Sequence, residues 1–214
     1  MMQVNDTIEQ IKNAGIIAMM RGQFSIEYYV EVANTLSSAG VCVLEVTLNS
    51  PDALKAIASL RREMGESMLI GAGTVRNVTH ARVSLAAGAQ FLVSPNLDLP
   101  TVSYSKNQRV LHLPGIFTAT EAATAHAAGC RLVKLFPADL LGPAYLKALR
   151  APLDDVDFVP TGGITSGNIG AYAQAGAVSV GVGSALIAGS EQSLEDIQTR
   201  GKELIAAWRS VRNG

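Results

Sequence analysis

The sequence predicts an α/β fold: a closed barrel of eight parallel strands, each followed by a helix, the (β/α)8 or TIM-barrel class. Short apolar runs ending in Gly, Pro, Ser or Asn alternate with longer, alanine-rich stretches of helical period. From first to last, the runs advance by roughly 23 residues per unit, which suits one strand and one helix with short loops. The chain length of 214 residues lies at the lower end of the range for such barrels.

The predicted strands are almost continuously apolar, as expected for parallel strands that are covered on both faces. In chain order they occupy residues 15–21, 42–48, 68–75, 91–96, 109–115, 131–137, 157–163 and 178–184. An open, doubly wound sheet is the alternative. That fold usually carries a glycine-rich phosphate fingerprint after its first strand, and Arg21-Gly22-Gln23 is not one. The closed barrel is therefore favoured.

Two helices at the ends of the chain have clear signals. Asp6 is expected to cap a short helix over residues 7–13, with Glu9 three positions on and Gly15 just beyond its end. We expect this helix to cover the bottom of the barrel. The last helix carries an apolar stripe at spacings of three and four, formed by Leu194, Ile197, Leu204, Ile205, Trp208 and Val211. No linker interrupts the pattern, so residues 1–214 are expected to form one domain.

Composition excludes several classes of partner. Seventeen basic and eighteen acidic residues give a net charge of −1, which removes the electrostatic attraction used by proteins that bind nucleic acids or anionic membranes. No apolar run approaches the roughly 18 residues of a membrane span. The N-terminus has no secretion signal. We expect a cytoplasmic protein with no nucleic-acid or membrane partner.

The cysteines and histidines show no metal-binding pattern. Cys42 and Cys130 have no CxxC or CxxH neighbour, so buried, reduced thiols are expected instead of disulfides or a zinc site. His80, His112 and His126 are scattered and have no ligand partner in sequence, which favours packed or solvated side chains. No metal and no other cofactor is expected.

A lysine stands inside the sixth predicted strand. The alternation of side chains turns Leu132, Lys134 and Phe136 to one face. A lysine inside a barrel is desolvated, and the lowered pKa that follows is what Schiff-base chemistry requires. The alternative is a lysine that pairs with a buried carboxylate purely for packing. Because buried lysines are rare, we favour the catalytic interpretation.

A glutamate in the second strand is the predicted partner of this lysine. Alternation turns Val43, Glu45 and Thr47 to one side. The second and sixth strands face each other across an eight-membered ring, and alternate strands contribute to the same layer, so Glu45 is expected to approach Lys134. This arrangement gives a general acid/base beside an amine nucleophile. A buried ion pair without chemistry is the alternative, although such pairs stabilise proteins poorly.

Glycines end the last two predicted strands. Residues 160–163 read Pro-Thr-Gly-Gly, and residues 181–184 read Gly-Val-Gly-Ser. The loops after strands seven and eight are the recurrent phosphate site of these barrels, so we predict that phosphate binds there. The alternative is a pair of tight turns. Thr74, after strand three, and Arg21, after strand one, offer a hydroxyl and a guanidinium suited to a substrate carboxylate.

Six motifs together resemble the class I 2-keto-3-deoxy-6-phosphogluconate (KDPG) aldolase family, in order and spacing and over nearly the whole chain. They are LEVTL at 44–48, GAGTV at 71–75, SP at 94–95, LPG at 113–115, VKLFPA at 133–138 and PTGGI at 160–164. The resemblance implies a barrel that assembles as a homotrimer and uses no metal. It also implies cleavage of the phosphorylated keto-deoxy sugar acid to pyruvate and glyceraldehyde 3-phosphate.

The resemblance also implies a role for each matching residue. Lys134 would form the Schiff base, and Glu45 would shuttle protons. Thr74 and an arginine would hold the carboxylate at the pyruvate end. The remaining roles concern the walls and the phosphate: Phe136 and Pro95 would line the pocket, and Gly162, Gly163 and Ser184 would hold the phosphate.

Two signals disagree about which C4 epimer is the substrate. Many family members have an arginine where this chain has Asn49, whereas Arg21 and the LNSP sequence at 48–51 resemble the galactonate-cleaving branch. Thr161 matches the gluconate branch. Thr161 is expected near the hydroxyls where the epimers differ, and Arg21 near the pyruvate half that they share. We therefore predict the gluconate epimer, with 2-keto-3-deoxy-6-phosphogalactonate as the alternative.

Two further classes of protein share the glycine loops. One is a phosphate-binding barrel of another reaction class, such as an epimerase or a prenyl- or thiamine-phosphate synthase, which does not need Lys134 facing Glu45. The other is a non-catalytic phosphosugar-binding barrel, which would bind the ligand without turnover. The sequence carries no appended regulatory segment that would favour a sensor.

Overall fold

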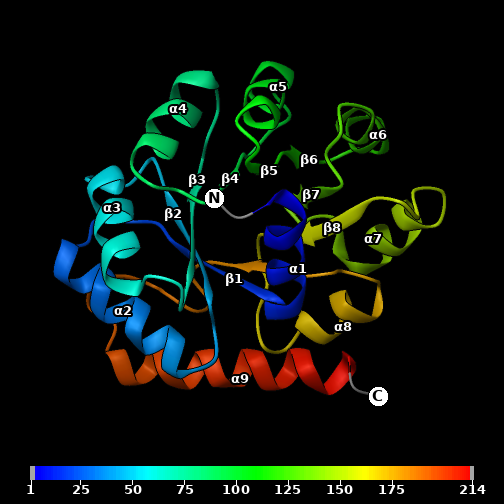
Figure 1. The fold of residues 1–214 in the computed structure, drawn as a ribbon. Helices are drawn as coiled ribbons and strands as arrows, with labels where there is room; N and C mark the ends of the chain where they lie inside the picture. Colours follow the sequence, from blue (N-terminus) through cyan, green and yellow to red (C-terminus); the bar gives the residue numbers. More distant parts are fainter. Residues whose placement is uncertain (1–2, 213–214) are drawn as a thin grey trace.

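The computed structural model describes residues 3–212, in which parallel strands alternate with helices. The strands are β1 (Ile16–Met20), β2 (Val43–Thr47), β3 (Leu69–Gly73), β4 (Phe91–Val93), β5 (Leu111–Leu113), β6 (Gly115–Ile116), β7 (Leu132–Leu135), β8 (Asp157–Pro160) and β9 (Val180–Val182). The helices are α1 (Val4–Ala14), α2 (Ile26–Ser38), α3 (Ala53–Met64), α4 (Val78–Ala86), α5 (Leu99–Asn107), α6 (Ala119–Ala127), α7 (Gly142–Arg150), α8 (Ile169–Gln174) and α9 (Leu194–Arg212). In Figure 1 the helices α2 to α9 surround the strands, and α1 lies in the middle of that ring.

The strands form two hydrogen-bonded sheets instead of the single closed sheet that the sequence predicts. One sheet has the order β5-β4-β3-β2-β1-β9 and the other β6-β7-β8, with every pair parallel. The division falls within the predicted strand 109–115. Pro114 separates β5 from β6 there, and proline has no N–H group to donate to a neighbouring strand.

Hydrogen bonds also connect the two sheets at their other edges. The N–H of Val178 donates to the carbonyl of Phe158 at 3.1 Å, and Thr161, just after β8, forms a parallel bridge with Gly181 of β9. On the other side, the N–H of Lys134 donates to the carbonyl of Pro114 at 2.9 Å. The two edges of each sheet therefore lie beside those of the other.

Two apolar layers follow from the alternation of side chains along the strands. The inner layer joins Ile8 and Ile11 of α1 to one side chain or more from seven strands: Ile17, Val43, Leu69, Phe91, Val93, Leu111, Leu113, Leu132 and Val159. Most of these residues stand near the starts of their strands, so α1 packs against the amino-terminal ends. The outer layer, which includes Leu44, Ile70 and Leu92, packs between the strands and the helices. The carboxyl ends of the strands are left for the functional residues.

The predicted short N-terminal helix is present, but Asp6 does not cap it. The helix begins earlier, with Gln3 at the cap, and the carboxylate of Asp6 accepts from the N–H of Gln3 at 3.4 Å. Asp6 therefore occupies the third helical position, as the acidic member of a capping box. The predicted end is confirmed. Gly15 has a φ of 74°, and its N–H donates to the carbonyl of Ile11 at 3.0 Å.

The last helix, α9, packs along α2 and α8 (Figure 1). Four members of the predicted stripe are buried, namely Ile197, Leu204, Ile205 and Trp208. The indole of Trp208 lies directly against Gly15, where a Cβ atom would come within 1.9 Å of its Nε1. Among residues 3–212, no helix combines the length and apolar character of a membrane span.

The cysteines differ from the expectation in one respect. Cys130 is buried, but Cys42 is exposed, and neither forms a disulfide. Cys42 precedes the first residue of β2 and belongs to neither apolar layer.

Candidate active site

All ten predicted site residues line one cavity of about 340 Å³ at the carboxyl ends of the strands. They are Arg21, Glu45, Thr74, Pro95, Lys134, Phe136, Thr161, Gly162, Gly163 and Ser184. In the chain these residues are spread over 164 positions, from 21 to 184, and the parallel strands bring them together because all of their carboxyl ends face the same way. The structure thus places them in one site and leaves their roles to be tested.

Lys134 extends from β7 into the wall of this cavity. Only 6% of the residue is exposed. Its Nζ lies 4.9 Å from the centre of the Phe136 ring. Burial lowers the pKa of Lys134, the Glu45 carboxylate opposes that shift, and the positive charge of Arg21 adds to it. A lysine in this state has a larger fraction of neutral, nucleophilic amine than a lysine in water.

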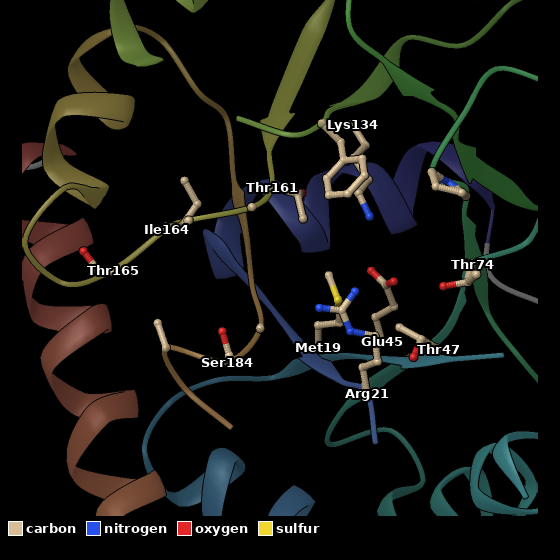
Figure 2. Close-up of a pocket in the computed structure, with 16 residues that line it drawn as sticks. Met19, Arg21, Glu45, Thr47, Thr74, Lys134, Thr161, Ile164, Thr165 and Ser184 are labelled. Atoms are coloured by element: carbon tan, nitrogen blue, oxygen red, sulfur yellow. The ribbon is translucent and has the colours of Figure 1, made fainter. Parts of the chain in front are cut away.

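Glu45 enters the cavity from β2, on the opposite side. Figure 2 shows its carboxylate and the Lys134 amine pointing toward each other. Burial raises the pKa of Glu45, whereas Lys134 and Arg21 oppose the rise. Its Oε1 has no hydrogen-bond partner. Among the ion pairs within residues 3–212, none joins Glu45 to Lys134 within 4.0 Å.

This arrangement differs from a structural ion pair. A buried pair that served packing alone would close its charges into direct contact, because desolvation is otherwise uncompensated. Here the two groups face one cavity across a gap, and one carboxylate oxygen stays unpaired. A buried polar atom without a partner is typical of a site that a ligand completes.

A glycine makes room for the glutamate. A Cβ atom on Gly73 would lie 1.7 Å from Oε1 of Glu45. Gly73 pairs with Thr47 on the neighbouring strand, so it stands beside the glutamate in the sheet. The second glycine of the GAGTV motif is therefore required by the position of Glu45, since any side chain there would displace the carboxylate.

Thr74 and Arg21 stand at opposite sides of Glu45 (Figure 2). The hydroxyl of Thr74 donates to Oδ1 of Asn49 at 3.4 Å. After Arg21, the N–H of Gly22 donates to Oγ of Ser50 at 3.1 Å, and that oxygen lies 3.2 Å from Oγ1 of Thr47. Ser50 thus ties the end of β1 to the end of β2. Arg21 itself is exposed at the cavity.

The glycine-rich end of the cavity lies on the side of β8 and β9. Gly162 and Gly163 have φ values of 100° and 66°, a region that side chains disfavour. A Cβ atom on Gly163 would also lie 2.4 Å from Cβ of Asp139. The side chain of Asn168 fixes this loop, because it donates to the carbonyl of Gly163 and accepts from the N–H of Thr165, both at 2.8 Å. The left-handed φ values of Gly162 and Gly163, and the closeness of Asp139 to Gly163, explain why glycines occupy these positions.

Six further residues line the cavity: Met19, Thr47, Ile164, Thr165, Gly183 and Ala185. Gly183 belongs to the segment 181–184 that was predicted to bind phosphate, and the other five were not predicted as site residues. Strand alternation carries the signal for two of them. Thr47 shares a face with Glu45, and Met19 precedes Arg21 by two positions on β1. Ile164, Thr165 and Ala185 stand on loops, where no periodic pattern indicates which way a side chain points.

The histidines lie outside the cavity. His112 is buried in β5, and His80 lies on α4 and does not line the cavity. His126 of α6 lies 3.6 Å from Asp155. Within the described part of the chain, no three His, Cys, Asp or Glu side chains gather in a way that would hold a metal ion.

Known proteins with related sequences share most of this chain. A sequence model of the aldolase family described as "KDPG and KHG aldolase" matches residues 7–201. A probable 2-dehydro-3-deoxy-6-phosphogalactonate aldolase of Rhizobium meliloti (strain 1021) is 34% identical over 200 residues, which are 93% of each chain. A 2-dehydro-3-deoxy-phosphogluconate aldolase of Treponema pallidum (strain Nichols) is 38% identical over 173 residues, 80% of each chain.

A solved structure is similar as well. It is a KDPG aldolase from Legionella pneumophila in which pyruvate was captured at low pH as a covalent carbinolamine intermediate. This structure is 28% identical to the chain and has a TM-score of 0.80, over 94% of this chain and 96% of that one. The fold and the arrangement of strands are therefore shared with enzymes of this family.

Proposed function

Because the chain belongs to the KDPG and KHG aldolase family, we propose that it cleaves a 2-keto-3-deoxy-6-phospho sugar acid by the class I, Schiff-base mechanism. The observation that carries this proposal is the buried Lys134 opposite the buried, unpaired Glu45 in one cavity. The reaction releases pyruvate and glyceraldehyde 3-phosphate, and it requires no metal.

The proposed reaction starts with neutral Lys134. Its amine attacks the C2 ketone, and Glu45 transfers the protons that form and dehydrate the carbinolamine. The iminium then accepts electrons as the C4 hydroxyl loses its proton, to Glu45 directly or through water, and the C3–C4 bond breaks. Glyceraldehyde 3-phosphate leaves. The enamine is protonated and hydrolysed, which releases pyruvate and regenerates the amine. The lowered pKa of Lys134 and the raised pKa of Glu45 support these roles.

We propose that the other predicted residues bind the two ends of the substrate. Thr74 and Arg21 would hold the carboxylate beside C2, and Phe136 and Pro95 would form the walls. At the far end, Gly162, Gly163 and Ser184 would hold the phosphate. The glycines support this assignment, because a backbone without side chains exposes its N–H groups to an anion.

The proposed substrate is the gluconate epimer. Thr161 supports it, since this residue lines the cavity between Lys134 and the glycine loop (Figure 2). The galactonate epimer is the second candidate. Arg21 favours it, as does the similarity to the Rhizobium meliloti aldolase over 93% of both chains. Measuring kcat/KM for both epimers decides between them, and a higher value for the galactonate would replace our assignment.

The core of the proposal is tested by trapping with pyruvate and borohydride. We expect a covalent adduct on Lys134, identified by mass spectrometry of the digested protein, and none in a Lys134→Met variant. Pyruvate release coupled to lactate dehydrogenase tests turnover. A protein that binds the sugar acid but releases no pyruvate would be a non-catalytic phosphosugar-binding barrel.

Full activity after dialysis against a chelator is expected, and a loss that zinc or magnesium restores would contradict the metal-free mechanism.

We also propose that residues 1–214 form one domain in which the two sheets act as a single closed (β/α)8 barrel. The Val178–Phe158 hydrogen bond and the Thr161–Gly181 bridge support closure on one side. The continuity of the chain through Pro114 supports it on the other. Amide exchange by NMR is the test. The N–H of Val178 should be protected like those within the sheets, and rapid exchange there would contradict closure.

A cytoplasmic homotrimer is the proposed assembly. The family resemblance supports it, together with two apolar side chains on the surface near the carboxyl ends of the strands, Phe117 (39% exposed) and Leu140 (75% exposed). Light scattering after gel filtration measures the mass of the assembly. A monomer would contradict the proposed trimer. A trimer that the Leu140→Glu substitution leaves unchanged would show that the surface around Leu140 is not its interface.

A further inference from the structure

Two buried polar residues stand behind the cavity and take no part in the proposed chemistry. Ser94, which follows β4, is fully buried, and His112, in the middle of β5, is 5% exposed. His112 pairs with Leu92 across the two strands, and Leu92 belongs to the outer apolar layer. Ser94 and His112 therefore lie on the face toward the helices, and neither lines the cavity.

A chain of hydrogen bonds connects these two residues to the end of β3. The hydroxyl of Ser94 donates to the carbonyl of Val75. Its Oγ also lies 2.7 Å from Nε2 of His112. Val75 is fully buried, and its own N–H donates to the carbonyl of Val93 at 3.0 Å. Both polar groups of Val75 are thus held by the neighbouring strand.

The direction of the chain is set by the chemistry of its members. A carbonyl only accepts, so the single proton of the Ser94 hydroxyl goes to Val75. Nε2 of His112 must then be the donor toward Ser94, which leaves Nδ1 without a proton. Nδ1 has no hydrogen-bond partner, and burial lowers the pKa of His112 to about 4, against the opposing effect of Asp98. Both facts agree with a neutral imidazole that donates through Nε2.

The residue before Val75 is Thr74, whose backbone is in an unfavourable conformation. Its φ is 59°, in the left-handed region, which β-branched residues rarely adopt. Such a conformation persists only where the surroundings fix it. On one side, the carbonyl of Gly73 accepts from the N–H of Leu48 at 2.9 Å. On the other side stands Val75, held by Val93 and Ser94. The side chain between them lines the cavity.

We propose that Ser94 and His112 are positioning residues, which hold the carbonyl of Val75, the residue after Thr74, and so keep the Thr74 hydroxyl directed at the substrate carboxylate. The role of Thr74 in this inference rests on the proposed function. The side chains of Lys134 and Glu45 make no hydrogen bond to Ser94, His112 or Val75. Loss of the chain should therefore weaken binding of the carboxylate much more than it slows the steps at C3 and C4.

Substitution of Ser94 tests the chain where it contacts Val75. In Ser94→Ala we expect KM, and the pyruvate concentration that half-saturates borohydride trapping, to rise on the order of tenfold, with kcat within about twofold. In the ligand-free protein, hydrogen exchange of the segment around residues 74–76 should increase. Unchanged exchange together with an unchanged KM would overturn the proposal.

His112 is tested by a matched pair of variants. His112→Gln keeps a side-chain N–H donor, whereas His112→Leu removes it at similar size. We expect the leucine variant to resemble Ser94→Ala and the glutamine variant to restore most of the affinity. Equal values for the two variants would overturn the donor role of His112. Thermal unfolding of each variant detects a general loss of stability. Such a loss would not raise KM selectively while leaving kcat unchanged.

A double-mutant cycle asks whether Ser94 acts through Thr74. In a Thr74→Ala background, Ser94→Ala should raise KM by less than about twofold, because the hydroxyl that it positions is already absent. The same tenfold rise in both backgrounds would overturn the proposal. Trapping of pyruvate on the wild-type protein tests the proposed function separately. If pyruvate is not trapped on Lys134, the Schiff-base function fails, whereas the exchange at residues 74–76 still decides whether Ser94 holds this turn.

Discussion

At the scale of single residues, the site depends on two charges that are kept apart in a buried cavity. Lys134 and Glu45 shift each other's pKa values in opposition to burial, so each group limits how far burial shifts the pKa of the other. Both were predictable from the sequence, because a charged residue on the inward face of an apolar strand is rare. Ile164 was not, since it stands on a loop, where no periodic pattern indicates which way its side chain points.

The pH dependence of imine formation should respond to Glu45. The carboxylate raises the pKa of Lys134, so neutralising it in Glu45→Gln lowers that pKa further. The amine then stays neutral to a lower pH, and the acid limb of the trapping rate with saturating pyruvate should move to lower pH. Turnover itself should fall by roughly 10²- to 10⁴-fold through loss of the proton shuttle.

The control for this prediction is Glu203→Gln, which removes an exposed carboxylate on α9. Its trapping profile should match that of the wild type. An acid limb that stays in place in Glu45→Gln, or moves to higher pH, would show that the carboxylate does not act on the Lys134 amine.

Gly73 should be intolerant of even one methyl group. The new Cβ of Gly73→Ala would overlap Oε1 of Glu45 at 1.7 Å and displace the carboxylate. A displacement of this size costs on the order of 100-fold in kcat. Gly167→Ala is the matched control, because a Cβ there has only Thr165 Oγ1 nearby, at 3.7 Å. Normal kcat in Gly73→Ala would mean that the position of Glu45 is not critical.

At the scale of elements, the sequence predicted the strands better than their connections. Each predicted strand contains an observed one, because the apolar runs are short and end in turn residues. The break at Pro114 was not predicted. A missing N–H interrupts a sheet only where a carbonyl of the neighbouring strand would accept from it, and the sequence does not show which carbonyl lies there. The Ser94–His112 contact was missed for a similar reason: it joins residues from different strands, and neither residue shows a partner in sequence.

The junction of β4 and β5 should weaken as the pH falls. The pKa of His112 is lowered by burial from 6.5 to about 4, so the unfolded chain binds a proton in this range and the folded chain does not. The contribution of neutral His112 to the free energy of unfolding is fully present above pH 6.5. It is lost as the pH falls toward 4, by about 3 kcal/mol in total. Urea unfolding at several pH values measures it. His112→Leu should show a smaller decline, and an unchanged slope would contradict this assignment.

The contact between α1 and α9 should be sensitive to Gly15. In Gly15→Ala the left-handed φ of 74° and the overlap with Trp208 act together, and we expect a loss of at least about 2 kcal/mol in the free energy of unfolding. Gly189→Ala is the control, because a Cβ there meets nothing within 4 Å and its φ is not in the left-handed region. Urea denaturation compares the two, and equal stabilities would refute the prediction.

At the scale of the whole molecule, the fold separates Lys134 and Glu45 from the glycine loops to which we assign the phosphate. The Lys134 end of the cavity is built by β2 and β7, and the glycine end by the loops after β8 and β9. In the proposed function, binding energy from the phosphate would orient the distant C3–C4 bond. The sequence predicted where these glycines lie, because they fall on the two expected strands, and their binding of phosphate stays a prediction. The epimer could not be read from the sequence, since one hydroxyl configuration depends on distances within the cavity.

A substrate without its phosphate should consequently react poorly. We expect kcat/KM for the unphosphorylated sugar acid to fall by on the order of 10³-fold or more, with a decrease in kcat as well as a rise in KM. Steady-state kinetics with both substrates gives the comparison. Similar values for the two would mean that the glycine loops do not bind phosphate during turnover.

The pairing of β1 with β9 also bears on how the chain matures during synthesis. The first strand lies between β2 and β9 in the sheet, and Gly15, just before it, rests on Trp208 of the last helix. A ribosome releases these elements from the N-terminus onward. One edge of β1 therefore remains unpaired until residue 180 has emerged, and Gly15 meets its tryptophan only after residue 208 has been translated. Arg21 follows that strand directly, so we expect a nascent chain to stay inactive until α9 is free to dock.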